Sequence, residues 1–259
     1  MTKIREPLAD IYNLNSPVQY LTELQKLKYN QPNYIVSAFQ YYLKNSVFLE
    51  SKGNITVIDF ACGYGVFGAL IRKFDQIEHM FKYYIDGYDI SDLGNCDPIK
   101  GRIEIIGVDV ADKALHFALE NGFIDYAICH DFTSKDNDIK ILNVDKIHEA
   151  DIIIETGSPP QIFLDCLPGI LSRFDRMKLP DILLGPRSDF DLEKIWIYLC
   201  GLGYSIQEYD SINYPFRAFE SDFERDAVRE HVRKNSFDER NVFDENGYLF
   251  KIYLCQFKA

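Results

Sequence analysis

The feature that most constrains this chain is an apolar run that ends in an acid and leads at once into a glycine-rich turn. Residues 55–60 read Ile-Thr-Val-Ile-Asp-Phe, and Gly63, Gly65 and Gly68 follow in a segment with helical character. A short apolar run favours a buried parallel strand, and glycine lets the backbone turn sharply and approach a ligand without a Cβ atom in the way. The stretch therefore predicts a strand, a tight turn and a helix that together bind a nucleotide-like cofactor.

From residue 55 onward, strand-like and helix-like segments alternate, which is the pattern of a parallel sheet covered by helices on both faces. We expect strands at residues 55–60, 102–109, 125–130, 150–156 and 180–185, and a less regular insertion at residues 75–100 with a loop around residues 92–98. After residue 204 a strand-like stretch at 204–209, a charged helix at 221–235 and a strand-like run at 247–257 follow. The last run suits an antiparallel strand at the end of the sheet.

Two helix-like segments precede the first strand and are separated by a break at residues 30–33. Ser16 and Pro17 predict the start of the first, because serine caps helices and proline suits the first helical position. In the second, apolar residues recur at steps of three and four and give one apolar face, formed by Tyr34, Ile35, Ala38, Phe39, Tyr42 and Leu43. We expect residues 1–50 to form a helical lid or substrate cap and residues 51–259 to form the main domain.

The predicted fold class is therefore α/β, with a Rossmann-like, mostly parallel sheet, helices on both faces, an N-terminal helical lid and an antiparallel C-terminal strand. At 259 residues and 47% hydrophobic content, the chain can bury the core of one such domain. Its formal net charge of -12 disfavours a phosphate backbone, which binds mainly Lys and Arg, so we expect no nucleic-acid partner.

The six cysteines are scattered, without a CxxC pair or metal-ligand spacing, so we expect reduced thiols and no metal site. No apolar run is long enough to cross a membrane, and the first residues lack the apolar core of a signal peptide. We therefore expect a cytoplasmic protein with no membrane partner. Its oligomeric state stays open.

The three glycines match the G-x-G-x-x-G pattern of dinucleotide-binding folds, in which phosphate sits on a helix N-terminus. Three features argue against NAD. A long segment precedes the strand, and Asp59 stands before the first glycine. The next strand-terminal acid, Asp109, comes much later than the roughly 20 residues that usually separate the glycines from the ribose-binding acid. An NAD(P)-dependent oxidoreductase nevertheless stays open as an alternative.

Residues 57–65, Val-Ile-Asp-Phe-Ala-Cys-Gly-Tyr-Gly, resemble motif I of the class I S-adenosylmethionine-dependent methyltransferases, in which an acid precedes a Gly-x-Gly turn. Ala61 stands where that family often has glycine. The resemblance continues over residues 105–118, 127–132 and 150–160, which look like the next three strands and their loops, and it spans roughly residues 55–205. S-adenosylmethionine (SAM) carries no phosphate, and its ammonium group is well matched by a nearby carboxylate.

The resemblance implies that Asp59 helps to hold the methionine end of SAM and that Asp109 binds the ribose hydroxyls. It further implies that Asp131 receives the adenine amino group and that Phe132 packs on the ring. Glu155 would face the departing methyl group, as a substrate contact or a base. The complete set of cofactor-binding residues implied is Asp59, Ala61, Cys62, Gly63, Tyr64, Gly65, Asp109, Val110, Asp131, Phe132 and Thr156.

The implied activity is SAM-dependent transfer of a methyl group to an oxygen or nitrogen acceptor on a small or carrier-borne molecule. A second alternative is a cofactor-binding but inactive partner subunit. We expect His130 to be a structural histidine or an adenine-side contact rather than a base. We expect Arg187, just past the fifth strand, to be a surface arginine, with pairing to an acidic substrate as the alternative, and the charged run from Arg217 to Lys234 to be a solvated helix.

Overall fold

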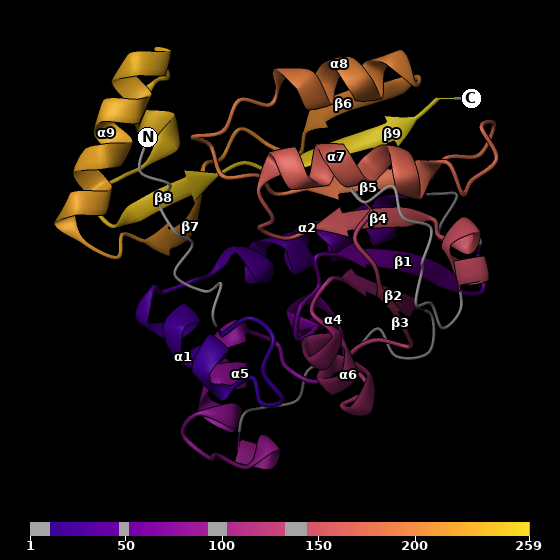
Figure 1. Cartoon of the computed structure of the whole chain (residues 1–259), viewed down its shortest axis with the longest axis horizontal. Helices are drawn as coiled ribbons and strands as arrows, with labels where there is room; N and C mark the ends of the chain where they lie inside the picture. Colours follow the sequence, from indigo (N-terminus) through magenta and orange to yellow (C-terminus); the bar gives the residue numbers. More distant parts are fainter. Residues whose placement is uncertain (1–10, 47–51, 93–102, 133–143, 259) are drawn as a thin grey trace.

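The computed structural model describes residues 11–46, 52–92, 103–132 and 144–258. Seven strands form one sheet in the order β3-β2-β1-β4-β5-β9-β6. They are β1 (Ile55–Phe60), β2 (Ile103–Asp109), β3 (Tyr126–Cys129), β4 (Ile152–Glu155), β5 (Asp181–Leu184), β6 (Tyr204–Glu208) and β9 (Tyr253–Phe257). The first five run parallel, and β9 pairs antiparallel with both β5 and β6 (Figure 1). The predicted fold class is confirmed, and the five expected parallel strands lie close to their expected bounds.

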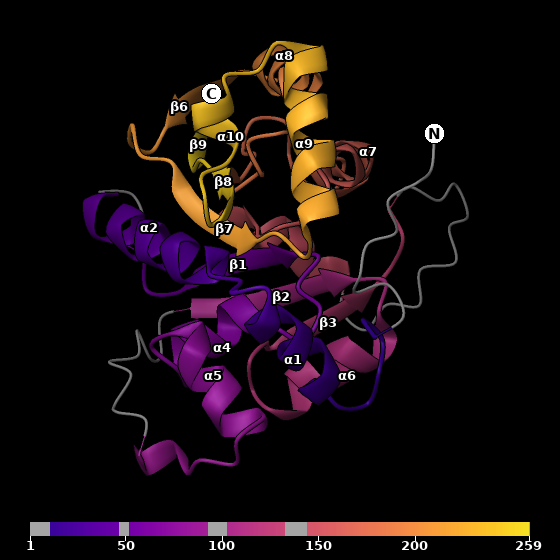
Figure 2. The same cartoon turned by 90° about the vertical axis from the view of Figure 1, so that its left-hand side faces the viewer.

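Helices cover both faces of this sheet. On one face lie α4 (Val66–Arg72), α5 (Ile77–Tyr84) and α6 (Asp112–Glu120), and on the other lie α7 (Pro160–Leu171) and α8 (Glu193–Gly201) (Figure 2). Successive residues of β1 serve the two sides, because side chains alternate along a strand. Val57 lies in the hydrophobic cluster with α4, and Ile58 lies in the cluster with α7. Both faces of β1 are therefore buried against helices, as its continuous apolar run predicts.

The N-terminal helices are α1 (Val18–Lys26) and α2 (Gln31–Asn45). The expected break was placed too late, because Pro32 lies in the first turn of α2. Proline is tolerated there, since the first N–H groups of a helix have no partner within it. Ile35, Ala38, Phe39, Tyr42 and Leu43 are buried, which confirms the predicted apolar face. Leu21 of α1 and Phe39 of α2 belong to the hydrophobic cluster that includes β1, whereas the division into a cap and a main domain stays a prediction.

The expected single strand at 247–257 is wrong. β8 (Gly247–Phe250) pairs with β7 (Tyr214–Ala218) in a separate two-stranded sheet, and β9 then enters the main sheet between β5 and β6 rather than at its end. An unbroken aromatic and apolar run does not show where a chain changes its pairing partner, because both strands favour the same residue types. The small sheet and α9 (Asp222–Asn235) lie together on the left of Figure 1.

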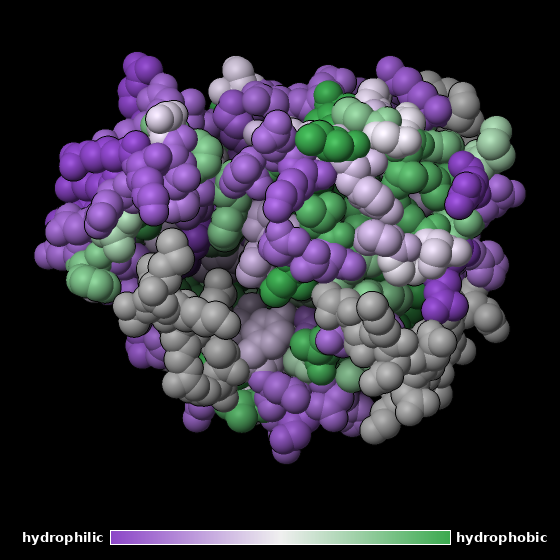
Figure 3. Space-filling model, turned by 45° about the horizontal axis from the view of Figure 1, so that its top comes forward, coloured by the Kyte–Doolittle hydropathy of each residue, from purple (hydrophilic) through white to green (hydrophobic). Residues whose placement is uncertain are grey.

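α9 is the expected charged helix, and it begins after Ser221, whose hydroxyl accepts from the Glu224 backbone N–H at 3.2 Å. Hydrophilic side chains dominate the left-hand part of the space-filling view, where α9 lies (Figure 3). The remaining elements are α10 (Glu239–Val242) and two short 3-10 helices at Ile90–Asp92 and Val144–Glu149. The insertion contains the regular helix α5, and the loop expected at 92–98 lies almost wholly outside the described residues. No helix in the described parts of the chain has the length and apolar character of a membrane span.

Gly68 shows why the third glycine of the turn is needed. A Cβ atom built on it would stand 2.0 Å from the backbone oxygen of Phe123, so α4 could not pack at its present distance. We expect Gly68→Ala to lower the free energy of unfolding by about 1–3 kcal/mol or more, because overpacking forces the backbone to shift. Urea unfolding followed by circular dichroism measures this.

The matched control is Gly201→Ala in α8, where an added Cβ meets nothing within 4 Å. Alanine favours a helix, so this variant should be neutral or more stable by up to about 1 kcal/mol. Equal stabilities for the two variants would contradict the packing role of Gly68.

Candidate active site

The turn after β1 has an unusual backbone. Ala61, Gly63 and Gly65 have φ values of 54°, 50° and 71°, all in the left-handed region. Such a conformation costs a residue with a Cβ atom free energy, which explains why glycine would also suit position 61. The turn brings the backbone N–H of Gly63 to the carboxylate of Asp109, where it donates a hydrogen bond of 2.8 Å.

Asp109 ends β2 and is held by three donors. Besides Gly63, the backbone N–H of Ala111 donates to it at 2.8 Å and the Tyr12 hydroxyl donates at 2.9 Å. Burial raises the pKa of Asp109, and these hydrogen bonds oppose that rise because they favour the carboxylate. The turn after β1 therefore helps to fix the side chain of Asp109, which was predicted to bind ribose.

Asp59 is buried beside this turn, with no exposed surface, and neither carboxyl oxygen has a hydrogen-bond partner among the described residues. Burial raises its pKa well above the usual range, and the nearby Asp109 and Glu155 add to the effect. Buried polar groups in folded proteins are almost always paired, because an unpaired one costs several kcal/mol by order of magnitude. A ligand with N–H donors or a positive charge would satisfy this carboxyl group through a water or after a shift of the turn, since the group itself has no exposed surface.

Glu155 ends β4, next to β1, and its Cα is paired in register with that of Phe60. Its carboxylate accepts a hydrogen bond from the backbone N–H of Ser158, and burial raises its pKa from 4.5 to about 7. Glu155 is not among the residues that line the neighbouring cavity, whereas Thr156 and Ser158 are. Its predicted role as base or substrate contact stays a prediction.

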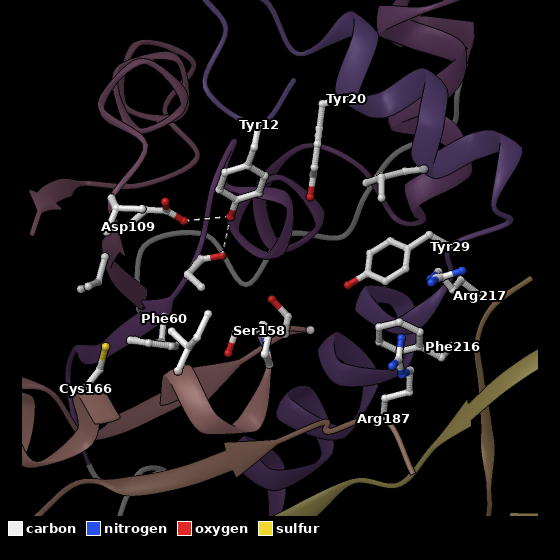
Figure 4. A pocket seen from close by; sticks show the side chains of 18 of the residues that line it. Tyr12, Tyr20, Tyr29, Phe60, Asp109, Ser158, Cys166, Arg187, Phe216 and Arg217 are labelled. Carbon is white, nitrogen blue, oxygen red and sulfur yellow. Dashed lines mark hydrogen bonds between the residues drawn. The ribbon is translucent and has the colours of Figure 1, made fainter. Parts of the chain in front are cut away.

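A cavity of about 420 Å³ opens along this edge of the sheet. It reaches from the ends of β1 and β2 past the loop after β4 to the small sheet (Figure 4). β1 lies between β2 and β4, so the chain leaves it toward one side of the sheet and later returns to the other. Ligands of open α/β sheets bind at such a switch point.

Of the predicted residues, five line the cavity: Ala61, Asp109, Val110, Asp131 and Thr156. The others are not among the residues that line it: Asp59, Cys62, Gly63, Tyr64, Gly65, Phe132 and Glu155. Tyr64 is fully buried, and its hydroxyl accepts from the Leu14 N–H and donates to the Leu14 carbonyl, both at 2.9 Å. These two hydrogen bonds attach the N-terminal segment to the turn after β1. Cofactor binding by the predicted residues stays a prediction.

Tyr12 is a site residue that the sequence did not reveal. Its hydroxyl bonds Asp109 and, at 3.2 Å, the Ala61 carbonyl, and a Cβ atom on Gly63 would stand 2.8 Å from that hydroxyl. The ring packs edge-on against Tyr20, which also lines the cavity. No helical or strand periodicity marks residue 12, so only the folded structure places it over the turn.

Three further residues that the sequence singled out also line the cavity. His130 lines the cavity, and burial lowers its pKa. Arg187 is not a surface arginine, since its side chain is only 18% exposed and lines the cavity. Arg217 does not belong to a solvated helix, because it lies in β7, 11% exposed, and lines the same cavity.

Phe216 and Arg217 reach the site because β7 is hydrogen-bonded to the segment between α1 and α2. The Asn30 N–H donates to the Phe216 carbonyl at 3.1 Å, and the Ala218 N–H donates to the Leu27 carbonyl at 2.6 Å.

The five described cysteines are all free, and Cys62, Cys166 and Cys255 are buried. Within the described ranges, no group of three His, Cys, Asp or Glu side chains could hold a metal ion.

No protein-family model matches this sequence. No curated protein matches it either. Among solved structures, the chain is similar to the magnesium protoporphyrin IX methyltransferase ChlM of Synechocystis PCC 6803 with bound SAM, at 12% identity and a TM-score of 0.45, over 93% of this chain and 84% of that one. It is also similar to a TehB-like SAM-dependent methyltransferase from Corynebacterium glutamicum, at 11% identity and a TM-score of 0.43, over 93% and 97% of the two chains.

A third solved structure is the plantazolicin methyltransferase BpumL in complex with SAH, at 12% identity and a TM-score of 0.44, over 97% and 96%. At these identities and TM-scores, the function of the chain has to be derived from its own sheet and site.

The buried Glu155 predicts a pH-dependent stability. Between its usual pKa near 4.5 and its folded pKa of about 7, the folded protein holds a proton that the unfolded chain has lost. Stability contributed by this group is therefore present below pH 4.5 and is lost as the pH rises through about 7. Relative to the parent, Glu155→Gln should gain stability on the order of 3 kcal/mol over this window.

Urea unfolding at a series of pH values measures that difference. Glu230→Gln, at an exposed position of α9, serves as the control, and its stability relative to the parent should not rise by several kcal/mol over this window. A stability difference for Glu155→Gln that does not change with pH would show that Glu155 is not held protonated by burial.

Proposed function

We propose that this chain is a class I SAM-dependent methyltransferase that transfers a methyl group to an oxygen or nitrogen of a small or carrier-borne molecule. The observation that carries the proposal is the buried carboxyl group of Asp59, which has no hydrogen-bond partner among the described residues. It lies beside a glycine turn and a strand-terminal Asp109, at the switch point of the sheet. The acid, turn and second acid follow the order that the sequence resemblance to this class implies.

The residues present fit the cofactor. Asp59 lacks the N–H or cationic partner that an amino-acid ammonium group would supply. Because Asp59 does not line the cavity, the ammonium group would reach it through a water or after a shift of the turn. Asp109 lies on the cavity wall, and a carboxylate has room to accept both hydroxyls of a ribose. Asp131 lines the cavity near the end of β3, where the adenine amino group would be received. Tyr20 and Tyr29 also line the cavity, and aromatic faces attract a sulfonium cation.

The charges around the turn weigh against a dinucleotide. Asp59, Asp109 and Glu155 lie close enough for each of the last two to raise the pKa of the first. A pyrophosphate placed on the turn would face these three carboxyl groups and would have to be held against their repulsion or their protonation cost. The sheet also differs from the order 3-2-1-4-5-6 of dinucleotide-binding folds, because the antiparallel β9 separates β5 from β6.

SAM, when bound, would supply a methyl group already activated by its sulfonium centre. The chain then has to align donor and acceptor and to exclude water, which its mostly apolar cavity walls favour. The pKa of Glu155, about 7, suits proton transfer near neutral pH. Because Glu155 does not line the cavity, it would take a proton from the acceptor only through a water or after a shift of the loop that follows β4. The open cavity supports an enzyme rather than an inactive partner subunit, for which an occluded substrate site would be expected.

Titration calorimetry tests the proposal. SAM and S-adenosylhomocysteine should bind at micromolar affinity by order of magnitude, and NADH should not bind. Asp109→Ala should weaken SAM binding by at least about tenfold, because hydrogen bonds to a charged group are lost.

The control variant is Glu120→Ala, which removes one negative charge from the exposed surface of α6 and should bind SAM as the parent does. Circular dichroism confirms that each variant is folded. Binding of NADH without SAM would make the chain a dinucleotide-binding protein, and unchanged SAM affinity in Asp109→Ala would refute the ribose assignment.

A further inference from the structure

The cavity has a second polar end, formed by two arginines that come from different parts of the chain. Arg187 follows β5 and Arg217 belongs to β7, and the two lie together across the cavity from Asp109 (Figure 4). Their guanidinium carbons lie 4.2 Å and 4.8 Å from the ring centroid of Tyr248, so both stack on the same buried tyrosine. Two positive side chains converge here in a protein of formal net charge -12.

Each guanidinium is held in a fixed orientation by a carboxylate. Arg187 donates from Nε and Nη2 to Asp189 at 2.6 Å and 2.9 Å, and Arg217 donates from Nη1 and Nη2 to Glu224 at 3.2 Å and 2.6 Å. The Tyr248 hydroxyl donates to Glu224 as well, at 3.0 Å. Paired, forked contacts of this kind fix the plane of an arginine and its direction.

The carboxylates are not on the cavity side. Arg187 and Arg217 line the cavity, whereas Asp189 and Glu224 do not. A ligand in the cavity therefore meets the cationic groups and not the anions that orient them. A guanidinium has five N–H donors in a planar fork. Arg217 uses two of them on Glu224 and a third, on Nη1, on the Ala218 carbonyl at 2.9 Å, so donors on Nε and Nη2 remain for an anion among the described contacts.

Between the two polar ends the walls are largely aromatic and apolar. Tyr29 and Phe216 pack edge-to-face with ring centroids 5.4 Å apart, and Leu24 and Leu27 of the N-terminal helices complete this stretch. Apolar walls with a few fixed polar groups are typical of sites for small organic ligands.

We propose that Arg187 and Arg217 form the binding site for an anionic group, a carboxylate or a phosphate, on a small acceptor whose aromatic or apolar body lies against Tyr29 and Phe216. The assignment of this ligand as the methyl acceptor rests on the proposed function. The acidic end of the cavity then holds the cationic cofactor and the basic end holds the acceptor, so each end repels the other's ligand.

The test uses matched probes, in the presence of saturating S-adenosylhomocysteine. The probes are 3-(4-hydroxyphenyl)propanoate, its uncharged amide and 4-hydroxybenzyl phosphate, and calorimetry gives the affinity of each. We expect the parent to bind one or both anions at least about tenfold more tightly than the amide, the effect of a charge-assisted hydrogen bond. The tighter of the two anions identifies the carboxylate or the phosphate as the natural group.

Arg187→Met and Arg217→Met should reduce that preference to about twofold or less, since methionine keeps the apolar stem and loses the charge. Arg217→Met leaves Glu224 buried without its partner, so the double variant Arg217→Met/Glu224→Gln provides a second, charge-balanced version. The matched control is Arg229→Met on α9, which removes one arginine that does not line the cavity and should keep the full preference.

Equal binding of the anions and the amide by the parent would overturn the anion site, as would a preference that persists in both arginine variants. Loss of S-adenosylhomocysteine binding in the arginine variants would also overturn it, because the arginines would then hold the carboxylate of the cofactor. Failure of the parent to bind SAM or S-adenosylhomocysteine, with the anion preference intact in probes added alone, would instead refute the proposed function and leave the anion site standing.

Discussion

The hydrogen bond from the Gly63 backbone to the Asp109 carboxylate is the contact on which the site depends. It joins the turn after β1 to the end of β2, and the same carboxylate also receives the Tyr12 hydroxyl from the N-terminal segment. Three parts of the chain that are far apart in sequence thus meet at one buried acid. Because the turn takes left-handed backbone angles at Ala61, Gly63 and Gly65, it can approach Asp109 closely while α4 still packs beneath it.

Asp59 gives this arrangement its functional meaning. A fully buried carboxyl group without a partner destabilises the fold, and the adjacent Asp109 and Glu155 increase the cost of its ionisation. Buried carboxyl groups with a strongly raised pKa are typical of functional sites, where a bound ligand supplies the missing partner. At the other end of the cavity Arg187 and Arg217 are oriented by Asp189 and Glu224, so the two ends differ in the charge that they present to a ligand.

The sequence was sufficient for what local patterns determine. The Ile-rich runs of β1 and β4 and the spacing of Ile35, Phe39 and Leu43 in α2 report burial directly, because each side chain's environment follows from its period. Asp59 could be singled out because a tight turn seldom needs an acid and two glycines together, Glu155 because an acid at the end of an Ile-Ile-Ile strand is hard to explain by packing, and Asp109 through the family resemblance.

What depends on convergence of distant segments could not be predicted. Tyr12 and Arg217 have no local pattern that marks them as site residues. Arg187 follows a strand, but nothing local decides between a surface position and a partner for an acidic substrate. β7 was missed because its five residues carry no clear alternation. The run at 247–257 divides between two sheets for reasons that lie in its partners, not in its own residues.

The most direct test of the account is a crystal structure with S-adenosylhomocysteine. The ribose hydroxyls should lie on Asp109, and the amino group of the ligand should reach Asp59 through one water or after a shift of the turn, because Asp59 does not line the cavity of the free protein. Nucleotide phosphates bound over Gly63 and Gly65 would contradict it, as would a ligand bound elsewhere with Asp59 still unpaired.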